Sequence, residues 1–183
     1  MATRTEAKPE AAPRFAIYRK EDAPSFSETT CMETVGLTPV IEDGIVRATA
    51  EGADEGQEVK LLFASPGLSL TYAWFKSGFP LPLHSHDADC LYYIIAGSLK
   101  LGTEELGAGD GFLVGSNVPY SYTPGPDGVE VLEFRTADTF DIRFLGKTTA
   151  FWDKTVASLR AERGAWVGQR PPQERVAPGP AKA

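Results

Sequence analysis

The sequence predicts an all-β protein, an antiparallel double-sheet β-barrel with one helix near its carboxyl terminus. Nine short apolar runs follow one another along the chain, and turn residues separate them. The 18 glycines and 14 prolines favour many turns and hence many short strands. Only one longer segment has the periodicity of a helix. About nine strands at this spacing indicate a sandwich or a barrel.

The candidate strands are short runs of apolar, β-branched and aromatic residues. They span 45–48, 59–63, 68–75, 91–96, 98–101, 111–114, 118–122, 129–135 and 140–144. The turn signals are rich in Gly, Pro, Asp and Ser, and they fall at 42–44, 65–67, 76–78, 107–109 and 124–128. Each turn signal is expected to reverse the chain between two strands.

The single predicted helix spans residues 149–163. Phe151, Trp152, Val156 and Leu159 recur there at helical spacing, and a glycine follows as a stop signal. In a barrel protein such a helix packs over an open end of the barrel or against a partner subunit. We therefore expect it to have a structural role.

The chain of 183 residues is long enough for one well-buried core and short for two domains. Residues 1–13 and 171–183 are rich in Ala, Pro and charged residues, so we expect flexible ends. Residues 14–170 are expected to form a single barrel domain with amino-terminal strands and the carboxyl-terminal helix.

Composition excludes several classes of function. The net charge of −7 argues against binding to nucleic acid, whose phosphates favour basic surfaces. No apolar run approaches the roughly 18 residues of a membrane span, and residues 1–13 lack the apolar region of a secretory signal. Cys31 and Cys90 are too few for a secreted disulfide framework. We expect a cytoplasmic protein with free thiols.

The two histidines of the chain, His84 and His86, are the clearest candidates for chemistry. Residues two apart on a strand project to the same side, so both imidazoles can offer a nitrogen to one ion. This spacing predicts a shared metal site inside the barrel. The alternative is a pair of ordinary barrel histidines, hydrogen-bonded in a site that holds no metal.

The segment around these histidines resembles the first motif of the cupin superfamily. That motif is Gly, five residues, His-x-His, three or four residues, Glu, six residues, Gly. Gly78, His84, His86 and Gly97 match it in register, whereas Cys90 stands at the position of the Glu. The resemblance covers residues 61–135 and implies an antiparallel double-sheet barrel with the site inside.

The second cupin motif is less well matched. It is Gly, five residues, Pro-x-Gly, two residues, His, three residues, Asn. Here Gly115 replaces the Pro, Asn117 the second Gly, Tyr120 the His and Pro124 the Asn. Asn117 is a tolerable replacement, because Asn accepts the left-handed backbone conformation better than most residues.

The resemblance implies a metal site with three His and one Glu, of which two positions differ here. His84, His86 and Cys90 could form a set of two nitrogens and one thiolate for one divalent ion, most readily Zn or Fe, with Ni or Mn as further options. Alternatively, Cys90 is a small buried apolar residue. A bulge or bend between His86 and Cys90 would turn the thiol to the other face.

Tyr120 and Glu133 are the candidate catalytic residues. Tyr120 falls where the family places a ligand, and a neutral phenol hydrogen-bonds to substrate more readily than it binds metal. The alternative for Tyr120 is an ordinary packing aromatic. Glu133 shares one strand face with Arg135, so the pair could bind or protonate a substrate. The alternative for Glu133 is an exposed cross-strand ion pair.

These residues predict a metal-dependent enzyme that acts on a small organic molecule, and the resemblance implies dioxygenase, lyase or isomerase chemistry. The alternative function is a non-catalytic module that binds a small molecule at a degenerate site.

Both faces of the predicted strand 91–96 are apolar. One face can fill the barrel, and the other must be covered by another protein surface. We therefore expect a homodimer.

Overall fold

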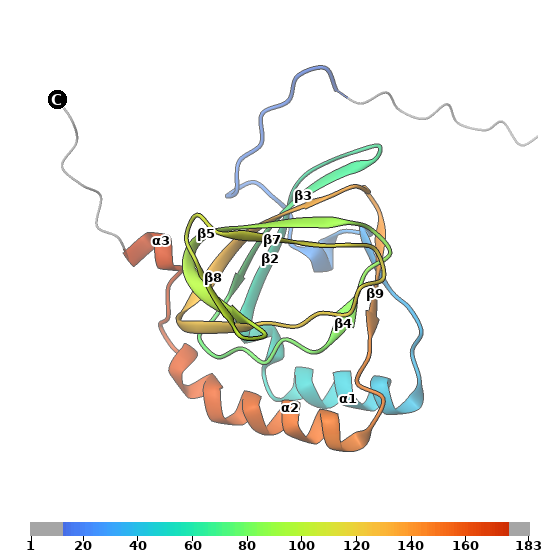
Figure 1. Cartoon of the computed structure of the whole chain (residues 1–183), viewed down its shortest axis with the longest axis vertical. Coiled ribbons are helices and arrows are strands. Elements are labelled where there is room, and N and C mark those ends of the chain that lie inside the picture. The colour runs from blue at the N-terminus through green and yellow to red at the C-terminus, as the bar shows by residue number, and fades with distance from the viewer. Residues whose placement is uncertain (1–12, 176–183) are drawn as a thin grey trace, which may run out of the picture.

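The computed structural model describes residues 13–175, whose strands form two sheets around a common interior (Figure 1). The larger sheet contains β2 (Gln57–Ser65), β3 (Leu68–Phe75), β8 (Thr123–Arg135), β5 (Cys90–Leu101) and β6 (Glu104–Gly107), in that order, with β7 (Gly111–Val114) paired to β5. The smaller sheet has the order β1 (Met32–Thr34), β9 (Phe140–Phe144), β4 (His84–Ser85). All pairs are antiparallel except β1 with β9.

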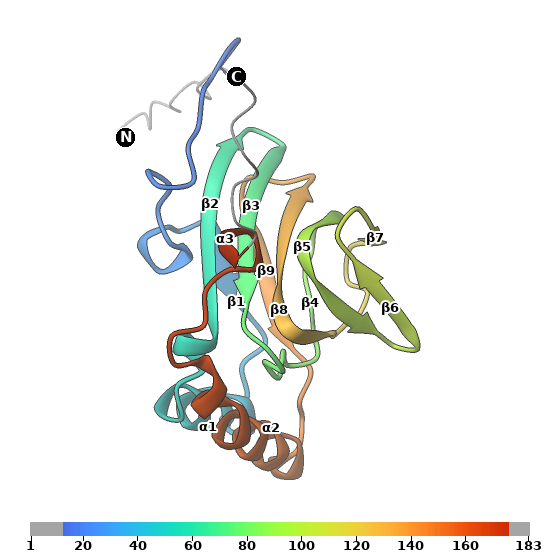
Figure 2. The same cartoon turned by 90° about the vertical axis from the view of Figure 1, so that its left-hand side faces the viewer.

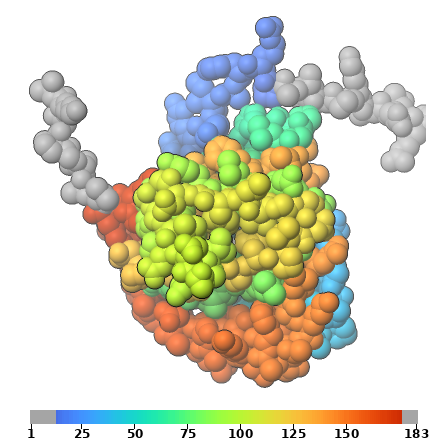
Figure 3. All heavy atoms as spheres, in the orientation of Figure 1, coloured from blue at the N-terminus to red at the C-terminus, as the bar shows by residue number. Residues whose placement is uncertain are grey.

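Two helices lie side by side across one end of the strands, α1 (Pro39–Ala50) and α2 (Thr149–Glu162) (Figures 1 and 2). Figure 3 shows the orange surface of α2 along the lower edge of the molecule. Short 3-10 turns occur at Phe26–Glu28, Ala53–Gly56 and Arg163–Trp166. A third helix, α3 (Pro172–Arg175), packs on β5 and β8. No helix within residues 13–175 is long and apolar enough to cross a membrane.

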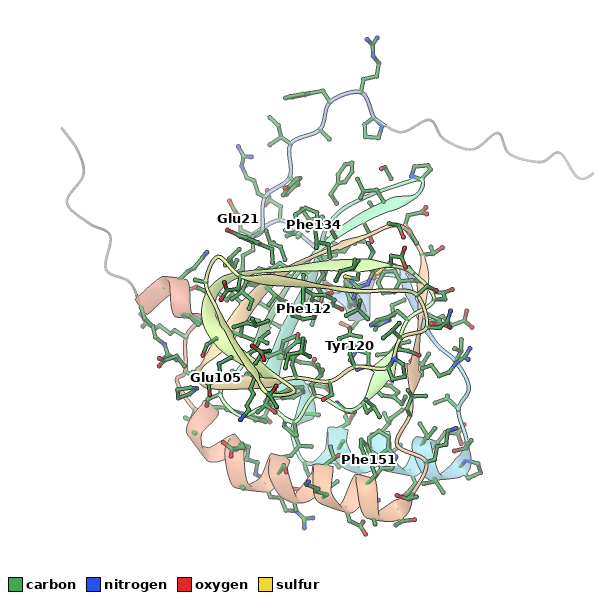
Figure 4. The ribbon with its side chains drawn as sticks, in the orientation of Figure 1. Glu21, Glu105, Phe112, Tyr120, Phe134 and Phe151 are labelled. Carbon is green, nitrogen blue, oxygen red and sulfur yellow. The ribbon has the colours of Figure 1, made fainter. Side chains whose placement is uncertain are left out.

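The core lies inside the two sheets and follows the alternation of strand side chains. Ala73, Ile94, Val129 and Val131 are fully buried and come from three adjacent strands. Phe112 and Tyr120 also lie in this interior, whereas Phe134 lies on the outer side of the larger sheet (Figure 4). Period-two patterning therefore determines which residues face the enclosed space.

Most of the predicted strands are confirmed. Segments 68–75, 111–114 and 140–144 coincide with β3, β7 and β9, and 59–63 and 129–135 lie within β2 and β8. The predicted strands 91–96 and 98–101 are one strand, β5, in which the pairing shifts at Gly97. The predicted helix is confirmed as α2, one residue shorter than expected.

The predicted strand 45–48 is wrong, because these residues lie in α1. Thr38 caps this helix by accepting a hydrogen bond from the backbone nitrogen of Ile41, and Pro39 is its first residue. Gly44, predicted as part of a turn, lies in the helix. A glycine is needed there because a Cβ would stand 2.0 Å from the ring of Trp152 on α2. The protein thus has a second long helix, which the sequence did not predict.

The region after β7 also differs from prediction. Residues 118–122 form no strand apart from one isolated bridge between Tyr120 and His84. The predicted turn at 124–128 lies inside β8, whose pairing with β5 is irregular there. Gly125 allows this close pairing, because a Cβ would stand 2.2 Å from the hydroxyl oxygen of Ser98.

Residues 171–175 are folded, in contrast to the flexible tail predicted from residue 171. Pro172 is buried, and the backbone nitrogen of Gln173 donates a hydrogen bond to Glu130. Residues 171–175 therefore belong to the folded protein. Most of the predicted flexible amino terminus, residues 1–12, and the rest of the tail, 176–183, lie outside the described residues.

Candidate active site

A cavity of about 310 Å³ runs from the space between the two sheets to the helices α1 and α2. One group of polar side chains gathers between the sheets. Other polar lining residues, among them Thr49, Asp54 and Gln57, lie apart from this group, and most of the remaining lining side chains are apolar. The polar group consists of His84, His86, Tyr120, Glu133 and Arg135. Few convergent polar groups in a largely apolar cavity are typical of a small-molecule site.

The two histidines face the cavity together, as their spacing predicts. His84 is on β4, which pairs with β9, and His86 follows the end of that strand. Their side chains are buried, and their ring centroids are 5.0 Å apart. The prediction that both imidazoles lie on one side of the strand is confirmed.

Hydrogen bonds fix the tautomer of both histidines. Nδ1 of His84 is 2.7 Å from the carbonyl oxygen of Pro82, and Nδ1 of His86 is 2.5 Å from that of Asp141. Because a carbonyl oxygen only accepts, each Nδ1 carries the proton and donates it. Nε2 of each ring therefore keeps its lone pair, the arrangement found in histidines that bind metals through Nε2.

Burial keeps these imidazoles neutral. It lowers the pKa of His84 to about 4, against a smaller opposing effect of the hydrogen bond to Pro82. Burial also lowers the pKa of His86 to about 4, and the positive charge of Arg135 acts in the same direction. At neutral pH both lone pairs are thus available to a metal ion or to a donor on a ligand.

Tyr120 lies beside the histidines, as predicted from its motif position. Its backbone exchanges hydrogen bonds with His84, and the two ring centroids are 4.4 Å apart. Asn117 makes the preceding turn, and within residues 13–175 it is the one residue other than glycine with positive φ, 61°. Its predicted role as a replacement for glycine is confirmed. Burial raises the pKa of Tyr120, so the phenol is protonated.

Glu133 and Arg135 form an ion pair that faces the cavity. Nη1 of Arg135 donates to Oε2 of Glu133 at 2.7 Å, and the guanidinium lies 4.3 Å from the ring centroid of Phe140. Both side chains are buried. The same-side pairing is confirmed, whereas the exposed pair considered as an alternative is wrong, because the smaller sheet covers this face of β8.

Cys90 is inside the protein but does not line the cavity. The chain bends at Asp87 and Ala88, so His86 and Cys90 belong to different sheets. Within residues 13–175, no three His, Cys, Asp or Glu side chains are grouped so that they could hold a metal ion. Burial raises the pKa of the Cys90 thiol to about 12, which favours the thiol over the thiolate.

Two parts of the site were not predicted from the sequence. The Tyr92 hydroxyl is hydrogen-bonded to that of Tyr120, and Tyr92 stacks on Phe112 with a centroid distance of 4.5 Å. The far end of the cavity is formed by α1, through Ile45 and Ala48 among others. Tyr92 could have been found from the sequence, because it lies two residues after Cys90 and therefore on the same face of a strand. The contribution of α1 was not predicted, although Thr38 followed by Pro39 is a helix-start signal.

Comparison with known proteins finds partial structural matches. KdgF from Halomonas sp. is 23% identical, with 44% of this chain and 79% of that chain covered and a TM-score of 0.39. An RmlC-like cupin from Shewanella frigidimarina is 22% identical, with coverages of 45% and 77% and a TM-score of 0.41. The polyketide cyclase RemF from Streptomyces resistomycificus is 20% identical, with coverages of 57% and 84% and a TM-score of 0.44. No family model and no curated protein matches the chain.

Proposed function

From the premise of a cupin-type fold with two neutral histidines in its interior, we propose that this protein is a metal-dependent enzyme. His84 and His86 would hold one divalent ion, and the substrate would be a small organic molecule in the cavity. The observation that carries this proposal is the pair of Nδ1–H donors bonded to backbone carbonyls, which leaves Nε2 of both rings free. A hydrogen bond from the ring nitrogen that does not bind the metal orients a histidine for metal binding.

The two imidazoles would supply two of the ligands of an ion, one fewer than the three protein ligands usual in a catalytic site. Two imidazoles suit Zn or Fe, and also Ni or Mn, and the other positions would be left to water or substrate. When bound, the ion would supply Lewis acidity or a site for dioxygen. Dioxygenase, lyase and isomerase reactions are all compatible with this chemistry.

The residues of the chain would position the substrate and handle protons. Tyr120 is protonated and can donate its proton to a substrate oxygen, a role typically worth about 10²–10⁴ in rate. The Glu133–Arg135 pair presents a fixed dipole to the cavity, where Glu133 can orient a donor or accept a proton.

Cys90 remains a predicted third ligand that needs its own test. The thiol could join the histidines only if the bend at Asp87 and Ala88 rearranged, since the three donors are not grouped. Cobalt substitution reports on this point through the charge-transfer absorption of a Co–thiolate bond. The band is expected to disappear in Cys90→Ser if Cys90 binds the metal, and its absence in the unmodified protein would exclude this ligand.

Metal analysis of protein purified without chelators or a metal-affinity tag tests the proposal. We expect about one divalent ion per chain, and loss of that ion in His84→Ala/His86→Ala with the fold retained. Tyr120→Phe is the matched control, because it should keep the metal and lose most of the activity. Stoichiometric metal in the double histidine variant would place the ion elsewhere.

A second candidate function is a non-catalytic module that binds a small molecule without metal. The absence of a third donor near His84 and His86, within residues 13–175, favours this function. It predicts protein that is free of metal when purified and that still binds a cavity ligand. The same metal analysis distinguishes the two candidates.

A further inference from the structure

The cavity has two chemically different ends. The end inside the strands carries the histidines, Tyr120 and the ion pair. The other end lies between the helices, where Ile45, Ala48, Trp152 and Leu159 line it. Thr155 also lines that end, but its hydroxyl already donates to the carbonyl oxygen of Phe151. Thr49 and Asp54 line it as well, and both are exposed, so they can remain in contact with water. The buried part of the helix end therefore favours hydrocarbon.

Phe144 connects the two ends. Its ring centroid is 6.4 Å from that of His84 and 6.1 Å from that of Trp152. A molecule lying along Phe144 would contact the polar group with one end and both helices with the other. The cavity thus fits an elongated occupant with a single polar end.

The hydrogen bond between Tyr92 and Tyr120 indicates which polar group the occupant carries. Tyr92 is 1% exposed, so its proton must be donated within the protein, and the Tyr120 hydroxyl is its bonded partner. With Tyr92 as the donor in this bond, the proton of Tyr120 is left for the cavity. Tyr120 can then donate to an acceptor on a ligand at this end.

The ion pair favours a neutral acceptor over a carboxylate. Arg135 is the one permanent cation among the described lining residues, and Glu133 already binds it at 2.7 Å. In the metal-free protein, a carboxylate entering this end would meet the charge of Glu133 with no uncompensated cation beside it. A ketone or aldehyde oxygen accepts from Tyr120 without that repulsion.

We infer that the substrate is an elongated apolar molecule with one carbonyl oxygen, bound with this oxygen at Tyr120 and its hydrocarbon body between α1 and α2. The inference deepens the proposed function, because it assigns a substrate class to the same cavity. It also makes Ala48 a residue that limits substrate length. Ala48 is buried at the helix end, whereas Ala50 on the same helix is exposed.

The test is calorimetric titration of protein freed of metal by a chelator, with the straight-chain 2-ketones from 2-butanone to 2-undecanone. Affinity is expected to rise about fourfold for each added CH₂ until the cavity is full. Ala48→Leu should stop this rise two or three carbons earlier and leave the short ketones unchanged. Ala50→Leu, the same change on the exposed side, should have no effect.

Two further variants test the orientation of the ligand. Tyr120→Phe should weaken every ketone by about fivefold, whatever its length, because one neutral hydrogen bond is lost. Ile45→Ala should extend the length limit, and it carries the test if Ala48→Leu fails to fold. Each straight-chain acid of equal length should bind more weakly than its ketone.

Several results would overturn the inference. They are the absence of ketone binding, an affinity that does not depend on length, a length limit unchanged by both α1 variants, or tighter binding of the acids. Because these titrations use metal-free protein, the substrate class can fail while metal analysis supports the metal site. Conversely, a protein that never binds metal can still show the predicted length limit.

Discussion

Strand β8 carries a buried glutamate on each of its faces, and the two are stabilised in different ways. Glu133 faces the cavity, and its charge is compensated by Arg135 at 2.7 Å. Glu130 faces outward, where the Tyr72 hydroxyl and the backbone nitrogen of Gln173 each donate to it at 2.7 Å. Lys20 approaches Glu130 only to 4.0 Å.

This difference distinguishes a residue of the candidate site, Glu133, from a residue with a structural contact, Glu130. Glu130 is enclosed by segments from both ends of the chain, so its bonds attach these segments to the sheet. Glu133 has an ion-pair partner on its own strand and open space on the other side. Burial of a carboxylate alone therefore does not identify a functional residue, whereas burial beside a cavity does.

The largest expected effect is the response of stability to acid, which involves the histidines on the cavity side of the protein. His84 and His86 are neutral in the folded protein down to about pH 4, whereas an unfolded histidine takes up its proton near pH 6.5. Between these values the unfolded state binds more protons, so stability falls as pH decreases. The loss is on the order of 3 kcal/mol for each histidine by pH 4.

Urea unfolding of metal-free protein between pH 7 and pH 4 measures this loss. His84→Gln/His86→Gln should show a shallower decline than the unmodified protein, because carboxylates alone remain to titrate. An equal decline in both proteins would show that the histidines do not contribute.

The next largest effect concerns the ion pair itself. Glu133→Gln leaves the buried charge of Arg135 without compensation and should lower the free energy of unfolding by about 3 kcal/mol. Adding Arg135→Met removes that charge and should recover most of the loss. Urea unfolding of the single and double variants measures both changes. No recovery in the double variant would contradict the assigned pairing.

A smaller effect is expected on the outer face. Glu130→Gln keeps the shape but turns one acceptor oxygen into a donor, which leaves one buried partner unpaired at a cost of about 2 kcal/mol. Trypsin cleavage after Arg175 should become faster, because Gln173, two residues before it, is held less firmly. The role of Glu130 in holding this segment would be contradicted if cleavage there were unchanged in Glu130→Gln, or if it were equally fast in Glu133→Gln.

The smallest effect on the folded chain concerns the uncovered part of the outer face. Leu91 pairs with Leu113 on one side and Phe134 on the other, and all three are exposed. This apolar row supports the expected homodimer. Light scattering should give about twice the chain mass of 19.7 kDa, and Leu113→Glu should give the monomer with little loss of stability. Val46→Glu, an exposed site on α1, is the control.

Local patterns in the sequence determined most strands and part of the site. Runs of apolar, β-branched and aromatic residues between turn signals marked β3 and β9 correctly, because such side chains favour strands. The two-residue spacing placed His84 and His86 together, because side chains two apart on a strand project to the same side. Asn117 fitted its left-handed turn because that preference belongs to the residue itself.

Only the tertiary structure decided the features that depend on distant partners. Gly44 signals a turn by composition but lies in a helix. Its glycine serves packing, because the ring of Trp152, far along the chain, occupies the space of a side chain. Cys90 lies apart from the histidines because the chain bends after His86 and continues into the other sheet. Period two fixes a side chain's face only while a strand continues, and sequence alone did not show where β4 ends.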